Sequence, residues 1–304
     1  MTRFLPSVAR IAKEYSLEHL FPHSQKNGKS LGFETEEAAL AEDLLRSKSL
    51  RRSGSDAALR LAAELEIAEV PQTAASSRFQ RNYRLHMAAA ILAALDELDA
   101  DDIRAFTALP VSGEVAVGHL LDQDPRAHLE RFRQQLNRIG GGNGNGFLWA
   151  VLEAEYEPSD SLLYFHLHGI AAGDFIARLK KLRKLGSYRP RKRVQQPLRF
   201  EKLKSTKARA KWASYTLKGY WKERRKGPVG DRQIIKRERR VRRLSEPHHT
   251  TMLLWLDRHS ASDFTLFMGA RLVGSKLRLT KPAQAERVRR QNIRHNSRRR
   301  LAEC

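Results

Sequence analysis

The sequence predicts an α+β fold, in which an antiparallel sheet carries flanking helices between a largely helical N-terminal region and a basic C-terminal extension. Three observations predict it. Residues 147–157 and 162–170 alternate in polarity with period two and are joined by a Pro-Ser-Asp-Ser turn. Apolar stripes at helical spacing lie on either side of this strand pair. From residue 103 the elements read strand, helix, strand, strand, helix, strand, helix, and the helices are expected on one side of the sheet.

The first hundred residues are expected to be mostly helical. Residues 36–46 and 56–68 are rich in Ala, Leu and Glu, and residues 81–98 carry one apolar stripe. Gly28-Lys29-Ser30 resembles the end of a phosphate-binding loop, but the glycine expected five residues earlier is His23. The sequence therefore assigns no role to residues 1–100.

The middle of the chain, residues 101–226, contains the predicted sheet. Residues 103–109 are a short strand candidate. Asp124 and Pro125 are residue types that favour the N-cap and first position of a helix, and the apolar stripe that follows them ends at Gly140.

Two further helices and a strand follow the strand pair. Residues 174–185 are expected to be helical, because their apolar side chains recur at helical spacing, and residues 198–203 are a strand candidate. A long basic helix is then predicted over residues 206–225, capped near Ser205 and ended by Gly227-Pro228.

Charge is distributed unevenly along the 304 residues, whose formal net charge is +23. Residues 1–160 contain 18 Lys and Arg against 24 Asp and Glu, a net charge of −6. Residues 161–304 contain 39 against 10, a net charge of +29. An excess of this size attracts phosphate backbones and predicts a nucleic-acid partner. The alternative is a solvated basic surface, as in many ribosome-associated proteins. The arginine-rich end of residues 227–304 is expected to contact DNA.

Composition excludes several classes of protein. Hydrophobic residues make up 41% of the chain, which is too many for a disordered protein, and no apolar run is long enough to cross a bilayer. The N-terminus lacks the apolar segment of a secretory signal, so a cytoplasmic protein is expected. Cys304 is the only cysteine, which excludes a disulfide framework and a Cys-based zinc finger.

A candidate metal site lies on the strand pair. His166 and His168 share one strand face and stand about 6.6 to 6.8 Å apart along the strand. If the hairpin turns symmetrically about residues 159–160, Glu153 lies opposite His166, and Glu155 on the same face is the alternative third ligand. Two imidazoles and a carboxylate predict Mg²⁺ or Mn²⁺. The alternative is a half-buried strand whose imidazoles are satisfied by hydrogen bonds.

A candidate nucleophile lies on the basic helix. Tyr215 and Lys218 are three residues apart and would share one helix face. A phenol attacks a phosphate only where a nearby cation stabilises the phenolate or the charge that builds on the phosphate, and Lys218 would supply that cation. The alternative is that Tyr215 packs in the core beside Trp212 and Trp221.

Taken in order, three motifs resemble those of the HUH endonucleases, and in particular the single-tyrosine rolling-circle replication initiators (Rep proteins) of plasmids and phages. They are Phe106-Thr107-Ala108-Leu109, His166-Leu167-His168-Gly169 and Tyr215-Thr216-Leu217-Lys218. The resemblance covers roughly residues 101–226 and implies a nuclease domain there.

The order and spacing of the motifs separate the chain from other HUH proteins. Relaxases carry the tyrosine before the histidines, and the small HUH transposases have Tyr-x-x-x-Gln where this chain has Gly219. Two-tyrosine initiators space their tyrosines by four, whereas Tyr220 is five residues after Tyr215, about 140° round a helix.

The resemblance implies an enzyme that nicks one DNA strand at a replication origin. Tyr215 would become joined to the 5′ phosphate, the freed 3′ hydroxyl would prime synthesis, and reversal would rejoin the strand. No complete Walker motif is present, so a host helicase and polymerase are expected partners. The alternatives are a non-catalytic DNA-binding regulator and a transposase or phage initiator with the same chemistry.

Basic side chains of the second half are expected to hold this DNA, as a single strand or an origin hairpin, through its phosphates. Trp212 or Trp221 would offer a stacking surface for bases. The basic candidates are Arg189, Arg191, Lys192, Lys207, Arg209, Lys211 and Lys222.

Overall fold

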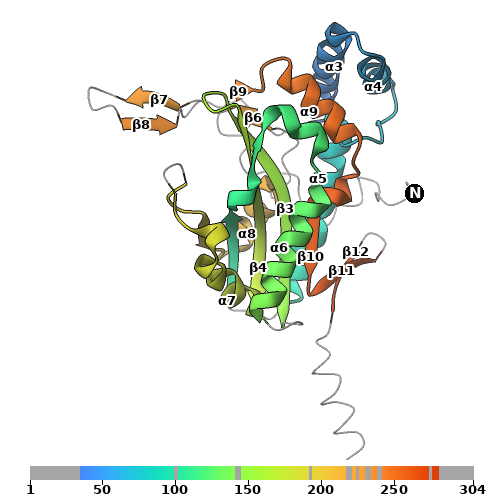
Figure 1. Cartoon of the computed structure of the whole chain (residues 1–304). Coiled ribbons are helices and arrows are strands. Elements are labelled where there is room, and N and C mark those ends of the chain that lie inside the picture. Colours follow the sequence, from blue (N-terminus) through green and yellow to red (C-terminus); the bar gives the residue numbers. More distant parts are fainter. Residues whose placement is uncertain are drawn as a thin grey trace, which may run out of the picture.

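The computed structural model in Figure 1 describes most of the chain between residues 35 and 280. The described ranges are 35–98, 102–140, 145–191, 194–216, 221–223, 226–229, 234–237, 242–273 and 276–280. No helix within these ranges is long and apolar enough to cross a membrane.

A mostly antiparallel sheet forms the centre of the molecule, as the sequence predicts. Its four principal strands lie in the order β5 (Leu198–Lys202), β1 (Ile103–Ala108), β4 (Leu162–Gly173) and β3 (Gly146–Glu157). All three pairings between them are antiparallel. The predicted strands, their order along the chain and the α+β class are therefore confirmed, and their order within the sheet is a finding of the structure.

Shorter strands extend this sheet with residues from other parts of the chain. β2 (Glu114–Ala116) pairs with β4, and β10 (Thr265–Met268) pairs with β3. β6 (Lys222–Glu223) runs parallel to β3 and pairs with β9 (Arg242–Arg243). Because β9 and β10 follow residue 226, the sheet includes strands from beyond the range of the predicted nuclease domain.

Two hairpins lie outside the main sheet (Figure 1). One joins β7 (Lys226–Val229) to β8 (Ile234–Arg237), and the other joins β11 (Ala270–Val273) to β12 (Lys276–Leu279).

One face of the sheet packs against α6 (Pro125–Gly140) and α7 (Asp174–Lys181), which begin and end close to the predicted positions. The apolar stripe of α6 enters the core on this face, where Phe132 stacks on Phe106 of β1 with ring centroids 6.0 Å apart. α9 (His248–Asp257) buries Trp255 in the same core.

The opposite face packs against α5 (Ser77–Asp96) and α8 (Thr206–Tyr215), so the expectation of helices on one side only is wrong. The physical reason lies in β3 and β4, whose side chains are buried on both faces along most of their length. Trp149 and Ile170 point to the second face and need cover there, as in sheets enclosed by helices.

The remaining N-terminal helices are α3 (Glu36–Ser53) and α4 (Asp56–Glu66), capped by Thr35 and Ser55. A buried ion pair joins α3 to α5, with Arg78 Nε 2.9 Å from a carboxylate oxygen of Asp43. The helical prediction for this region is confirmed over the part of it that the structure describes.

The predicted long helix over 206–225 is wrong. α8 ends at Tyr215, and Thr216 is its C-cap, with its amide and hydroxyl both donating to the carbonyl of Trp212. Lys222 and Glu223 instead form strand β6 beside β3. Lys218, Gly219 and Tyr220 lie outside the described residues.

Candidate functional site

The sheet face under α5 and α8 changes from apolar to polar partway along its strands. Trp149 of β3 pairs with Ile170 of β4, and both belong to the core beneath the two helices. One row further along, His168 pairs with Thr107 of β1 and Val151 of β3. Since side chains alternate between faces, the polar side chains of these rows emerge on one surface beyond the apolar core.

Three buried side chains of the β3–β4 hairpin form a compact cluster on this surface. Glu153 pairs directly with His166, so the predicted symmetrical hairpin register is confirmed. The Glu153 Oε2 atom lies 3.9 Å from His166 Nε2 and 3.7 Å from His168 Nε2. One ligand atom from each residue lies within 4.8 Å of the others, and all three residues are buried.

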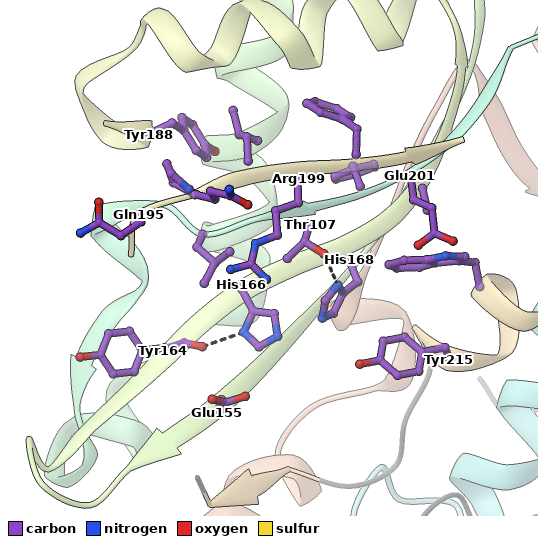
Figure 2. Close-up of a pocket in the computed structure, with 18 of the residues that line it drawn as sticks. Thr107, Glu155, Tyr164, His166, His168, Tyr188, Gln195, Arg199, Glu201 and Tyr215 are labelled. Atoms are coloured by element: carbon purple, nitrogen blue, oxygen red, sulfur yellow. Dashed lines mark hydrogen bonds between the residues drawn. The ribbon is translucent and has the colours of Figure 1, made fainter. Parts of the chain in front are cut away.

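Hydrogen bonds on the far side of each ring orient the two imidazoles. His166 Nδ1 donates to the carbonyl of Tyr164 over 2.9 Å, which leaves the lone pair of the neutral ring on Nε2. His168 Nδ1 forms a 2.8 Å hydrogen bond with the hydroxyl of Thr107. Figure 2 shows both bonds. Each Nε2 is thereby held toward Glu153, as in histidine ligands fixed by outer partners.

The donor set fits a divalent cation. Burial lowers the pKa of His166, which favours the neutral imidazole that a metal ligand requires. Two imidazole nitrogens and one carboxylate oxygen, without any sulfur, suit Mg²⁺, Mn²⁺ or a similar ion with positions left for other ligands. Glu153 is the carboxylate in this cluster, and Glu155 instead extends toward Lys222, whose Nζ lies 3.4 Å from its Oε2.

Tyr215 stands beside this cluster at the end of α8. Its ring centroid lies 5.9 Å from that of His168 at an interplanar angle of 73°, and 5.6 Å from that of Trp212. The side chain is 37% exposed, and Figure 2 shows its phenol directed into the space beside His166 and His168. The structure therefore brings together the histidine pair and the tyrosine that the sequence predicted from segments about fifty residues apart.

A groove of about 1020 Å³ opens onto both His168 and Tyr215. Its walls come from β1, β3, β4, β5, β6, α8 and the segment between α7 and β5, and they combine cationic with aromatic side chains. The cations are Arg183, Arg199, Lys211 and Lys222, and the aromatic side chains on the same side of the sheet as His168 are Tyr164, Trp212 and Tyr215. Phe106, Tyr188 and Phe200 also border the groove, but their rings belong to the core of the opposite face.

Of the basic residues predicted to contact DNA, two line the groove and two are paired with carboxylates. Lys211 and Lys222 line the groove. Arg191 is held by Glu114, with Nε 2.7 Å from Oε1, and Arg209 lies 3.8 Å from Asp96.

Two further predicted DNA contacts are described but are not part of the groove lining. Arg189 and Lys207 are exposed and do not line the groove, and Lys192 lies outside the described residues.

Two arginines that line the groove, Arg183 and Arg199, are not among the single residues predicted from the sequence to contact DNA. Arg199 pairs with Thr107, which places it in the same row as His168, and Arg183 lies 5.4 Å from the ring centre of Phe200. The signal for Arg199 was the alternation of the strand at 198–203, which assigns it to the polar face once the register with Thr107 is known.

Trp221 does not offer a stacking surface, so that expectation is wrong. It is buried in the core on the opposite face, where its ring lies 5.7 Å from Phe165 and 5.2 Å from Trp255. Trp212 is half-buried and lines the groove. The helix predicted over 206–225 would have carried both indoles, but α8 ends at Tyr215 and Trp221 directly precedes strand β6.

Two residues of the predicted motifs have a packing role. A Cβ added at Gly169 would lie 2.0 Å from the carbonyl oxygen of Trp149 and 2.7 Å from the ring of Phe106. Phe106 pairs with Gly169 across β1 and β4, so its ring covers the position that a side chain would occupy. The close approach holds β1 and β4 together directly beside His168.

Comparisons of the chain with models of protein families, with curated proteins and with solved structures find no match. The resemblance to HUH endonucleases stays a prediction, which rests on the three motifs quoted above.

Proposed function

We propose that this protein nicks and rejoins one strand of DNA, with Tyr215 as the nucleophile and a divalent cation held by Glu153, His166 and His168. The observation that carries the proposal is the position of the Tyr215 phenol in a groove beside the buried cluster. In this proposal the chain is an HUH-type, Rep-like rolling-circle initiator that acts in the cytoplasm.

The three ligand residues prepare the cation site without rearrangement. Their donor atoms already converge, and the hydrogen bonds to Tyr164 and Thr107 fix both rings. A bound Mg²⁺ or Mn²⁺ supplies Lewis-acid stabilisation of negative charge on a phosphate oxygen.

Tyr215 performs the covalent step as a transesterification. Its phenolic oxygen forms a bond to phosphorus, and the bond between phosphorus and the 3′ oxygen breaks. The phenol loses one proton and the departing 3′ oxygen gains one by exchange with solvent. One phosphodiester replaces another, so rejoining the strand needs no nucleotide cofactor.

The groove supplies the binding side of the mechanism. Lys211, Lys222 and Arg199 attract backbone phosphates along its walls. Trp212 presents a half-buried indole on which an unpaired base stacks. A single strand suits such a surface, because its bases are free to stack. A helicase and a polymerase of the host would complete replication.

The test is incubation of the protein with end-labelled single-stranded DNA from its replicon in the presence of Mn²⁺. The proposal predicts a covalent protein–DNA adduct that survives denaturation, a released fragment with a 3′ hydroxyl, and loss of both on adding EDTA. The net charge of +29 over residues 161–304 also favours plain DNA binding. Retention of DNA with no scission under any metal condition would establish that alternative instead.

Thr107→Val is expected to weaken Mn²⁺ binding by about 10- to 100-fold, the usual cost of removing an outer partner of a metal-bound histidine. Valine keeps the shape of threonine but removes the hydroxyl that holds His168 Nδ1. Isothermal titration with Mn²⁺ measures the affinity. Thr251→Val, on the exposed side of α9, is the matched control and should bind as wild type does. Equal affinities for the two variants would contradict the assigned role of Thr107.

A further inference from the structure

The C-terminal end of α8 carries Tyr215, so whatever fixes that end also fixes the phenol. The last carbonyl groups of a helix have no partner within it and need one from elsewhere. Ser214 Oγ donates to the carbonyl of Lys211, and Thr216 donates to those of Trp212 and Ala213. The amide of Thr216 also donates to Trp212, so the two side chains add hydrogen bonds to the last turn and supply one to the carbonyl of Ala213.

The next carbonyl, that of Ser214, receives its hydrogen bond from a distant part of the chain. Arg84 Nε of α5 donates to it over 2.7 Å, across a separation of 130 residues. Both residues are buried, with Arg84 7% exposed and Ser214 2% exposed. A buried guanidinium at a helix C-terminus also meets the negative end of the helix dipole.

This contact lies one peptide away from Tyr215. α5 and α8 pack together through a shared apolar core that includes Leu85, Ala88, Ala210 and Ala213. Apolar packing of small side chains restricts the distance between two helices but allows one to slide along the other. A short, charge-assisted hydrogen bond to one carbonyl restricts that sliding.

We propose that Arg84 is a positioning residue that holds the end of α8, and with it Tyr215, at a fixed distance from the His166–His168 pair. This inference rests on the proposed function, since it assigns Arg84 to the placement of the nucleophile. It gives the helical region before residue 100 a role in the site, through a residue that touches neither the groove nor the cluster.

The test compares Arg84→Met with Arg81→Met, a matched loss of a buried arginine one turn earlier on α5, where Arg81 donates to Asn82. At saturating DNA and Mn²⁺, Arg84→Met is expected to slow adduct formation about 100-fold, the effect of a small misplacement of a reacting group. Mn²⁺ affinity and DNA affinity should stay at wild-type values in both variants. If Arg84→Met does not fold, the same measurements are made on Arg84→Lys, which keeps the charge and the aliphatic stem.

Amide hydrogen exchange supplies a readout that does not depend on activity. Loss of Arg84 should accelerate exchange in the peptide that covers the end of α8, while peptides from β3 and β4 remain protected. Equal rates of adduct formation in Arg84→Met and Arg81→Met, or unchanged exchange at the end of α8, would overturn the inference. If wild-type protein forms no adduct, the proposed function fails, and the exchange measurement still decides whether Arg84 fixes the helix end.

Discussion

Tyr215→Phe is expected to abolish formation of the covalent protein–DNA adduct. The substitution removes one oxygen atom, so the ring keeps its contacts with His168 and Trp212. DNA and Mn²⁺ binding should therefore remain at wild-type values, and only the bond-forming step is lost. Denaturing electrophoresis of the protein with labelled single-stranded DNA measures the adduct, and a filter-binding assay measures affinity.

Tyr164→Phe is the control for this variant. Tyr164 also lines the groove, but its hydroxyl donates to Asp160 over 3.1 Å on the loop that joins β3 to β4. Its loss should leave adduct formation intact. An adduct that persists in Tyr215→Phe would show that another group attacks the DNA.

The double substitution His166→Ala/His168→Ala is expected to eliminate Mn²⁺ binding and DNA cleavage together. At a Mn²⁺ concentration of about 100 times the dissociation constant, binding stabilises the folded wild-type protein by about 2.7 kcal/mol. The double variant should gain none of this stabilisation, because it retains only the carboxylate of the cluster. Thermal unfolding with and without Mn²⁺ measures the difference.

His119→Ala controls for the general loss of a histidine, because that side chain is 71% exposed and lies 3.3 Å from Asp122, outside the cluster. Its stabilisation by Mn²⁺ should equal that of wild type. Stabilisation of the double variant to the same extent would contradict the assignment of the ligands.

The hairpin that carries the cluster was predictable because its determinants are local. Residues 158–161 set the turn, and the symmetry of the turn places Glu153 opposite His166. Strand alternation then assigns His166, His168 and Glu153 to one face. The same reasoning could not choose Glu153 over Glu155 firmly, since the choice depends on Lys222, whose strand β6 pairs with β3 from a distance in sequence.

The features that the sequence did not predict depend on contacts between distant segments. The basic composition of residues 206–225 favours one long helix, but Arg84 and Thr216 satisfy the carbonyl groups at an earlier end. The second layer of helices follows from the burial of β3 and β4 on both faces, which only the assembled sheet reveals. Arg199 joins the site through its pairing with β1.

Mass spectrometry of the denatured, protease-digested adduct tests the central claim most directly. Trypsin should release residues 212–218 as one peptide, since Lys211 and Lys218 bound it. The account predicts that this peptide carries a nucleotide on Tyr215 in protein treated with DNA and Mn²⁺, and that EDTA removes the signal. A nucleotide on any other residue, or on no residue while the DNA is cut, would contradict it.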